Sequence, residues 1–272
     1  MMVLMEYSEL EILIVRIREI SGFDFSGYAR PSLLRRASRY LTTHKMDFPQ
    51  LLAHIGPGGN VVYSLIQELT VNYSEMFRDA DFFMKVKAEV FSYLESYPTL
   101  RFWVAGCASG EEAYSLAIFL EEAGFLSRSL IYATDLSNKA LTAAREGIFT
   151  LGNVRTFSEN YLAAGGQHSL SDYYHVAYNK AAMLPELRRN IVFSLHDLTG
   201  DGVFNEFQFI SCRNVMIYFT LELRQKVFRL LYDSLSMLGF LCLGKRETLR
   251  YSGMEENFKV IDSTLNIYQK VR

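Results

Sequence analysis

The hydrophobic pattern changes character at about residue 100. Before that point, apolar residues recur every three or four positions, which predicts helices over residues 7–20, from Pro31 onward, and over 61–69 and 82–93. After it, short apolar runs alternate with amphipathic stretches. The runs predicted as strands are RFWVA, SLIYAT, NIVFSL, FQFISC and GFLCLG, with helices centred near Leu116, Leu141 and Phe228. Strands that alternate with helices indicate a parallel sheet covered on both faces.

Capping residues predict where several helices begin and end. Ser8 and Glu11 are spaced as a capping box, and Gly22 follows that helix. The remaining predicted caps are Ser137 with Gly147 at the far end, and Thr220 for a helix ending near Gly239. Residues 148–189 break the alternation, and the run DYYHVAYN within them predicts a small antiparallel insertion.

Composition argues against nucleic acid and membranes as general binding partners of this protein. A net charge of −2 over 272 residues gives no general attraction to nucleic acid or to an anionic membrane. Three widely separated cysteines in apolar runs favour reduced core thiols over a disulfide or metal framework, and no apolar run is long enough to span a bilayer. We therefore expect a cytoplasmic protein with no metal and no membrane insertion.

Polar residues follow four of the predicted strands, and parallel strands place such residues at one edge of the sheet. GCASGEE follows RFWVA, and its glycines allow a tight turn. Asp135 ends the second strand, where a carboxylate can bond both hydroxyls of a ribose. The next two strands end in Asp197-Leu198 and in Arg213-Asn214. This pattern predicts a site for an adenosine-containing ligand.

The glycine turn carries two adjacent acids, Glu111 and Glu112, at the start of a predicted helix. A helix N-terminus attracts anions, so a turn that binds pyrophosphate normally leaves this position free of acids. S-adenosylmethionine (SAM) has instead a cationic amino group and a sulfonium. The acids favour a SAM-dependent methyltransferase over a nicotinamide oxidoreductase, although one of the two acids can serve only to complement the helix dipole.

The second predicted helix has a basic face. Arg35, Arg36 and Arg39 lie opposite its apolar arc, and Arg30 precedes it. The pattern fits either a solvated face or a docking surface for an acidic partner.

The runs VAGCASGEEAYSLAI, ATDLS and FQFISCRNVMIYF, together with TVNYSEMFRD, resemble the CheR-type chemotaxis receptor protein-glutamate O-methyltransferases. The resemblance covers nearly the whole chain. It implies an α/β fold with a Rossmann-like SAM-dependent methyltransferase sheet, an N-terminal helical domain and a small inserted antiparallel β subdomain. The implied boundaries are 1–80 for the helical domain, 81–272 for the SAM-binding domain and 148–189 for the insertion.

By matched position, the resemblance implies roles for individual residues. Arg78 and Tyr218 are expected to position the substrate. The residues expected to contact SAM are Asn72, Ser74, Arg78, Glu112, Asp135, Asp197, Leu198, Arg213 and Asn214. Ser74 stands where the family usually has threonine, and Gly244-Lys245-Arg246-Glu247 replaces a frequent GHSE. These departures leave substrate choice more open than the chemistry.

The resemblance also implies a reaction and its partners. The methyl group of SAM passes to glutamate carboxylates on the cytoplasmic helices of chemoreceptors, leaving S-adenosylhomocysteine. An ordinary glutamate is ionised at neutral pH, so this displacement needs alignment and no general base. Because the methylated helices are acidic, the resemblance favours receptor docking as the role of the basic helix. It also makes the inserted subdomain a candidate for binding a receptor's C-terminal peptide. A SAM-binding regulatory or scaffold domain without turnover is the alternative.

Overall fold

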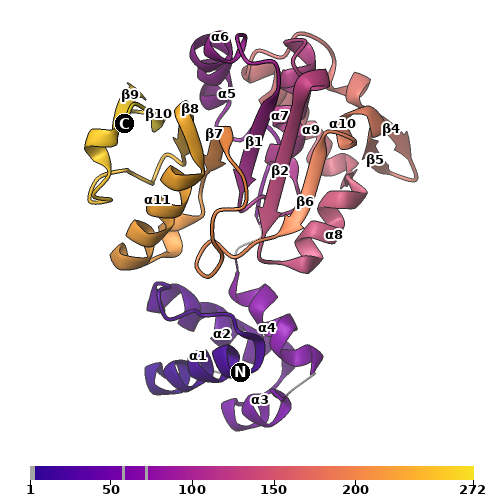
Figure 1. Ribbon diagram of the computed structural model, residues 1–272. Coiled ribbons are helices and arrows are strands. Elements are labelled where there is room, and N and C mark those ends of the chain that lie inside the picture. The colour runs from indigo at the N-terminus through magenta and orange to yellow at the C-terminus, as the bar shows by residue number, and fades with distance from the viewer. Residues whose placement is uncertain (1–3, 57–58, 71–72) are drawn as a thin grey trace.

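The computed structural model describes residues 4–56, 59–70 and 73–272. Its N-terminal part is a helical unit that lies below the main sheet in Figure 1. The helices of this unit are α1 (Tyr7–Ser21), α2 (Arg30–His44), α3 (Phe48–His54) and α4 (Asn60–Leu69). Their apolar faces share one core. Of the apolar arc predicted for α2, Leu33, Ala37, Tyr40 and Leu41 are buried in this core, and Leu34 packs against it partly buried.

The first helix begins at Tyr7, as the hydrophobic pattern predicts, but a different pair of residues caps it. Glu6 is the N-cap of α1, and its own backbone N–H donates to the Glu9 carboxylate at 2.9 Å. The capping box is therefore Glu6 with Glu9, and the predicted box of Ser8 with Glu11 is wrong. Gly22 closes the helix as predicted, with a left-handed φ of 79°.

One longer helical segment leads from the helical unit to the sheet. It consists of α5 (Ala80–Lys85), a π-helical turn η1 (Val86–Val90) and α6 (Phe91–Leu94). Its buried aromatic residues Phe82, Phe83 and Phe91 pack into the main core. This segment matches the helix predicted over 82–93 and anchors the connection to the sheet.

The main sheet has seven strands in the order β6-β2-β1-β7-β8-β10-β9. The strands are β1 (Leu100–Ala105), β2 (Ser129–Asp135), β6 (Ile191–Leu195), β7 (Phe207–Cys212), β8 (Leu235–Leu243), β9 (Phe258–Asp262) and β10 (Ile267–Lys270). Neighbours from β6 to β8 are parallel, whereas β10 is antiparallel to β8 and β9. All five predicted strands are present, which confirms the α/β class.

Helices cover both faces of this sheet (Figure 1). They include α7 (Glu111–Glu122) and α8 (Asn138–Glu146), which follow β1 and β2, and α11 (Leu221–Ser234), which precedes β8. Along β1, Phe102 and Val104 belong to the core that contains α7, whereas Trp103 and Ala105 belong to the core that contains α11. The alternation of side chains along a strand thus fills two cores, as the continuous apolar runs predict.

Ser137, Gly147 and Thr220 occupy their predicted capping positions. The end of α11 differs from the prediction, because the helix stops at Ser234 and not near Gly239. Leu235 already pairs with Phe207 of β7, so the helix ends where the strand pairing begins. The register then shifts between Phe207 and Phe209, and the exposed Leu238 adopts a left-handed φ of 63°.

The predicted antiparallel insertion is present as a three-stranded sheet in the order β3-β5-β4. Its elements are β3 (Ile148–Thr150), α9 (Leu151–Ala163), the 3-10 turn η3 (Leu170–Tyr173), β4 (Tyr174–Ala177), β5 (Lys180–Met183) and α10 (Pro185–Arg188). The hydroxyls of Tyr161 and Tyr173 both donate to the buried carboxylate of Glu122, which ties the insertion to α7. The insertion is therefore fixed to the main sheet by polar contacts as well as by packing.

Three further short 3-10 turns complete the chain: η2 (Leu126–Arg128), η4 (Met216–Tyr218) and η5 (Glu255–Asn257). The three cysteines are free and buried, in agreement with the prediction of core thiols. Within the described ranges, no helix has the length and apolar character needed to cross a membrane.

Candidate active site

A pocket of about 1060 Å³, including the part open to solvent, lies between the helical unit and the strand ends. The helical unit contributes Tyr28, Ser32 and Arg36 to its wall. The opposite wall comes from the residues that follow β1, β2, β6 and β7. A pocket of this size, lined by apolar groups with a few polar ones, is typical of a small-molecule site.

The glycine turn after β1 forms the floor of the pocket. Gly106 and Gly110 have φ values of 74° and 91°, and Ala108 between them is also left-handed at 48°. A Cβ atom on Gly106 would lie 2.4 Å from Val215 Cγ2. The loop that follows the neighbouring strand β7 can therefore come this close only to a glycine. The backbone N–H groups of Gly106 and Cys107 both donate to the Thr134 carbonyl oxygen, at 2.8 and 2.9 Å. The turn is thereby held against the end of β2.

Asp135 ends β2 and faces the same turn. Its Oδ2 accepts from the Ala108 N–H and its Oδ1 from the Ser137 N–H, both at 2.8 Å. Burial raises the pKa of this carboxyl, and the backbone hydrogen bonds oppose the rise. These two bonds, together with a weaker one from the Leu136 N–H, do not use all of the about four acceptor sites of a carboxylate, so Asp135 can still accept from a ligand hydroxyl.

The two glutamates of the turn point to different places. Glu112 lines the pocket, whereas Glu111 is buried beneath it. Glu111 Oε2 has no hydrogen-bond partner in the described part of the chain, and burial raises the pKa of this carboxyl. Of these two glutamates, only Glu112 therefore presents its carboxylate to the pocket.

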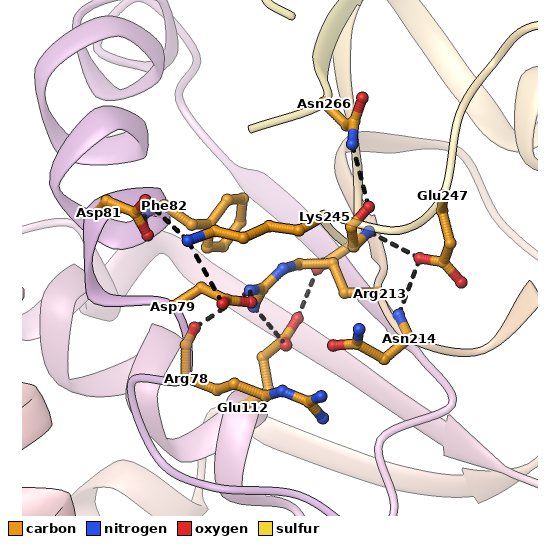
Figure 2. A network of polar contacts seen from close by, with 12 residues as sticks. Arg78, Asp79, Asp81, Phe82, Glu112, Arg213, Asn214, Lys245, Glu247 and Asn266 are labelled. Carbon is orange, nitrogen blue, oxygen red and sulfur yellow. Dashed lines mark hydrogen bonds and ion pairs between the residues drawn. The ribbon is translucent and has the colours of Figure 1, made fainter. Parts of the chain in front are cut away.

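Glu112 is held by a buried network that spans distant parts of the chain (Figure 2). Arg213 Nη1 lies 2.9 Å from Glu112 Oε2, and Arg213 Nη2 lies 2.7 Å from Asp79 Oδ2 and 3.1 Å from the Arg78 carbonyl oxygen. Its guanidinium also stacks over the Phe82 ring, 4.0 Å from the centroid. Ser211 Oγ donates to the other oxygen of Glu112. Arg213 thus orients Glu112 and fixes the backbone beside Arg78.

Comparison with known proteins identifies the protein family of the chain that forms this pocket. The sequence profile described as "CheR methyltransferase, SAM binding domain" matches residues 72–267, which include every strand end described above. The chain belongs to the CheR methyltransferase family. It is accordingly a SAM-dependent methyltransferase, as the acidic glycine turn predicted.

Three relatives illustrate the range of this CheR similarity. Cher3 of Pseudomonas putida, whose name gives methyltransferase activity as a provisional assignment, is 38% identical over 96% of each chain. The chemotaxis protein methyltransferase of Listeria innocua is 31% identical over 84% of this chain and 85% of its own. An uncharacterized 104.1 kDa protein of Rhodobacter capsulatus is 30% identical over 95% of this chain, which spans 27% of that protein.

The structure brings the predicted CheR site residues together. Asn72 lies outside the described residues. All the other residues predicted to contact SAM or to position the substrate line one pocket: Ser74, Arg78, Glu112, Asp135, Asp197, Leu198, Arg213, Asn214 and Tyr218. Asp197 Oδ1 accepts from both the backbone N–H and the hydroxyl of Thr199, at 2.8 and 2.7 Å, which orients it at the end of β6.

Arg78 and Tyr218 both line the pocket, from segments about 140 residues apart in the chain. Arg78 forms no ion pair within the described residues, and its guanidinium lies 5.8 Å from the centroid of the Tyr73 ring. Tyr218 belongs to η4, and its carbonyl oxygen accepts from the Ala29 N–H at 2.7 Å. The CheR site is therefore closed partly by the helical unit.

The four arginines of the predicted docking face separate into two groups. Arg35, Arg36 and Arg39 line an open groove beside the pocket, together with Gln67, Glu68, Thr70 and Tyr73. Arg30 is not among them, because its guanidinium pairs with Glu11 and donates to the carbonyls of Phe25, Ser26 and Tyr28. Arg30 thus braces the entry to α2.

Several pocket residues escaped the sequence reasoning, among them Tyr28, Ser32 and Tyr73. Tyr28 reaches the site through an isolated bridge to Phe219 and an edge-to-face contact with its ring, with centroids 4.8 Å apart. Burial and the charges of Asp197 and Asp135 raise the pKa of the Tyr28 hydroxyl. No local pattern signals this position, since the contact joins segments about 190 residues apart in the chain. Within the described residues, no group of His, Cys, Asp and Glu side chains is arranged to hold a metal ion.

Proposed function

We propose that this CheR-family protein transfers a methyl group from SAM to glutamate side chains on the cytoplasmic helices of chemoreceptors. The observation that carries the proposal is the continuity between the arginine groove and the SAM pocket, which share Arg36, Thr70 and Tyr73. A carboxylate attracted to the groove therefore has a direct path to the cofactor. The relatives named as chemotaxis methyltransferases support the choice of receptor.

The residues of the pocket fit SAM by their chemistry. Asp135 keeps acceptor capacity for the ribose hydroxyls, and Glu112 offers a negative charge to the cationic end of the cofactor. Ser74, Asp197, Leu198 and Asn214 complete the cradle in this proposal, and Asn72 precedes it in the sequence. Arg213 contributes by orienting Glu112, because its guanidinium is already engaged by two carboxylates.

The reaction requires alignment more than proton transfer. SAM, when bound, supplies the methyl group, and S-adenosylhomocysteine is the product. The target glutamate is already ionised at neutral pH, so the protein has to orient its carboxylate and exclude water. Arg78 and Tyr218 are the proposed positioning pair: the guanidinium donates hydrogen bonds to the carboxylate, and the hydroxyl donates to one of its oxygens. No base in the pocket has to remove a proton.

A receptor substrate has consequences for location and for binding. The enzyme would act in the cytoplasm, because the proposed target helices lie there. Strand β4 is an edge of the small sheet, and Val176 is 58% exposed there. A receptor's C-terminal peptide can add to such an edge through backbone hydrogen bonds, which would hold the enzyme near its target.

The test is methyl transfer from labelled SAM to receptor cytoplasmic fragments from the same cell. We expect base-labile label, released as methanol, on fragments that contain the methylation helices. Fragments in which the candidate glutamates are changed to aspartate serve as the matched control, because they keep the charge and remove the target geometry.

Two outcomes would count against the proposal. Thermal stabilisation by SAM without label on any receptor would indicate a regulatory SAM-binding domain. Label on a protein other than a receptor would keep the chemistry and replace the substrate.

A further inference from the structure

Glu247 is a buried carboxylate that lies outside the pocket and accepts hydrogen bonds from five backbone N–H groups. Figure 2 shows it beside Asn214. Its Oε2 accepts from the N–H groups of Gly244 and Asn214, at 2.6 and 2.8 Å. Its Oε1 accepts from Val215, Met216 and Ile217, at 2.8, 2.7 and 3.3 Å. Four consecutive N–H groups of one loop thus converge on one side chain.

The loop is shaped to make this convergence possible. Asn214 has a left-handed φ of 62°, which turns the N–H groups of residues 214–217 toward the same point. Such a turn forms a concave anion-binding site, and here the anion is supplied by the chain itself. Burial raises the pKa of Glu247, and the converging backbone donors oppose that rise by favouring the charged form.

Gly244 completes the arrangement from the other side. A Cβ atom there would lie 2.7 Å from Glu247 Oε2 and 2.8 Å from the Asn214 backbone nitrogen, so only glycine admits the contact. The Asn266 side chain donates to the Gly244 carbonyl oxygen at 3.0 Å and fixes this loop in turn. The carboxylate therefore has a defined position relative to β8 and β10.

The Glu247-bound loop, residues 214–217, begins at Asn214 and is followed directly by Tyr218, and both Asn214 and Tyr218 line the SAM pocket. On its far side the loop is held by the helical unit, where Ala29 N–H donates to the Tyr218 carbonyl at 2.7 Å and Thr220 N–H to the Gly27 carbonyl at 2.8 Å. The only carboxylate that meets the loop backbone between these points, among the described residues, is Glu247.

We propose that Glu247 is a positioning residue for cofactor binding and methyl transfer, which acts through the backbone of residues 214–217 on Asn214 and Tyr218. It touches neither ligand itself. The Tyr218 half of this inference rests on the proposed function, whereas the Asn214 half needs only binding of S-adenosylhomocysteine.

The test is a double-mutant cycle in the full chain, with S-adenosylhomocysteine affinity measured by calorimetry. Glu247→Gln keeps the shape of the side chain but turns an amide donor toward N–H groups that need an acceptor. We expect it to weaken binding about 10-fold, because several donors lose their acceptor. In an Asn214→Ala background the same change should have a much smaller effect, since the two residues act as one unit. Glu255→Gln, an exposed change on η5, should leave affinity unaltered.

A second cycle pairs Glu247→Gln with Tyr218→Phe and reads kcat with receptor fragments, where non-additive losses are again expected. Glu247→Asp retains the charge and should restore part of both functions. Additive losses in the affinity cycle, or a lower unfolding temperature with unchanged affinity, would overturn the inference and leave Glu247 a residue of the fold only. If no receptor is methylated, the proposed function fails, and the affinity cycle still decides the role of Glu247.

Discussion

The guanidinium of Arg36 lies over the ring of Tyr218, 5.2 Å from its centroid, and this contact joins α2 to the loop that follows β7. Arg36 also donates to the Leu69 carbonyl oxygen at 3.4 Å. Burial lowers the pKa of Arg36, an effect that Tyr218 opposes and that Arg35 and Arg39 reinforce. An arginine expected only to dock a partner is therefore a part of the pocket wall, beside the proposed catalytic tyrosine.

Changing Arg36 to alanine is expected to reduce kcat/KM for receptor fragments about 10- to 100-fold, the usual worth of a charge-assisted contact to a carboxylate. Arg39→Ala should reduce it less and mainly through association, so its effect should shrink at high salt. Initial methylation rates at several salt concentrations distinguish the two. Arg155→Ala, which removes an arginine 87% exposed on α9, is the matched control. Equal, fully salt-screened effects at positions 36 and 39 would place Arg36 on the docking face alone.

Local patterns predicted the frame of this site. Strand ends, the glycine turn and the caps at Ser137 and Gly147 depend on neighbouring residues, so the sequence contains their full signal. The same reasoning could not determine which glutamate of the turn enters the pocket. That choice depends on how α7 packs: its first residue, Glu111, turns into the core, and Glu112 turns toward Arg213.

The site contacts that the sequence did not predict join segments far apart in the chain. Arg213 meets Glu112 across 101 residues and Asp79 across 134, and Glu247 meets its loop across about 30. Such pairings become visible only when β7 and β8 are placed in the sheet. The family resemblance implies that Arg213 contacts the cofactor; in the structure Arg213 lines the pocket, and its guanidinium holds Glu112 and Asp79.

Replacing Tyr218 by phenylalanine removes the hydroxyl and keeps the ring beneath Arg36. We expect about a 10-fold lower kcat, because one hydrogen bond to the reacting carboxylate is lost, with little change in affinity for S-adenosylhomocysteine. Single-turnover rates measure the chemical step directly. Tyr251→Phe, at a tyrosine 71% exposed, provides the control. Near-full turnover in the Tyr218 variant would mean that the hydroxyl has no part in the reaction.

Asp135 predicts a pH dependence of cofactor binding. Because its pKa is raised above the ordinary value of 3.8, the carboxylate gains its proton at a higher pH than an exposed aspartate does. Affinity for S-adenosylhomocysteine should therefore be constant near neutral pH and fall as the pH drops through that raised pKa. Asp135→Asn should bind about 10- to 100-fold more weakly at neutral pH and lose this dependence. Calorimetry between pH 5 and pH 8 checks both, and an unchanged profile in the asparagine variant would assign the pH effect to another group.

Replacing the buried Glu111 by a residue that cannot ionise is expected to stabilise the folded protein. Its pKa is raised above the ordinary 4.5 by burial, so the folded protein binds this proton more tightly than the unfolded chain. Stability contributed by the protonated form is complete below pH 4.5 and is lost as the pH rises through the folded-state pKa. Glu111→Gln, which cannot ionise, should therefore unfold about 2 to 4 °C higher than the parent protein at pH 7.5, and this difference should vanish toward pH 4.5. Thermal unfolding across this range is the measurement, with the exposed Glu121→Gln on the same helix as control. A stabilisation that persists unchanged in acid would show that packing of the amide, and not the lost charge, is its cause.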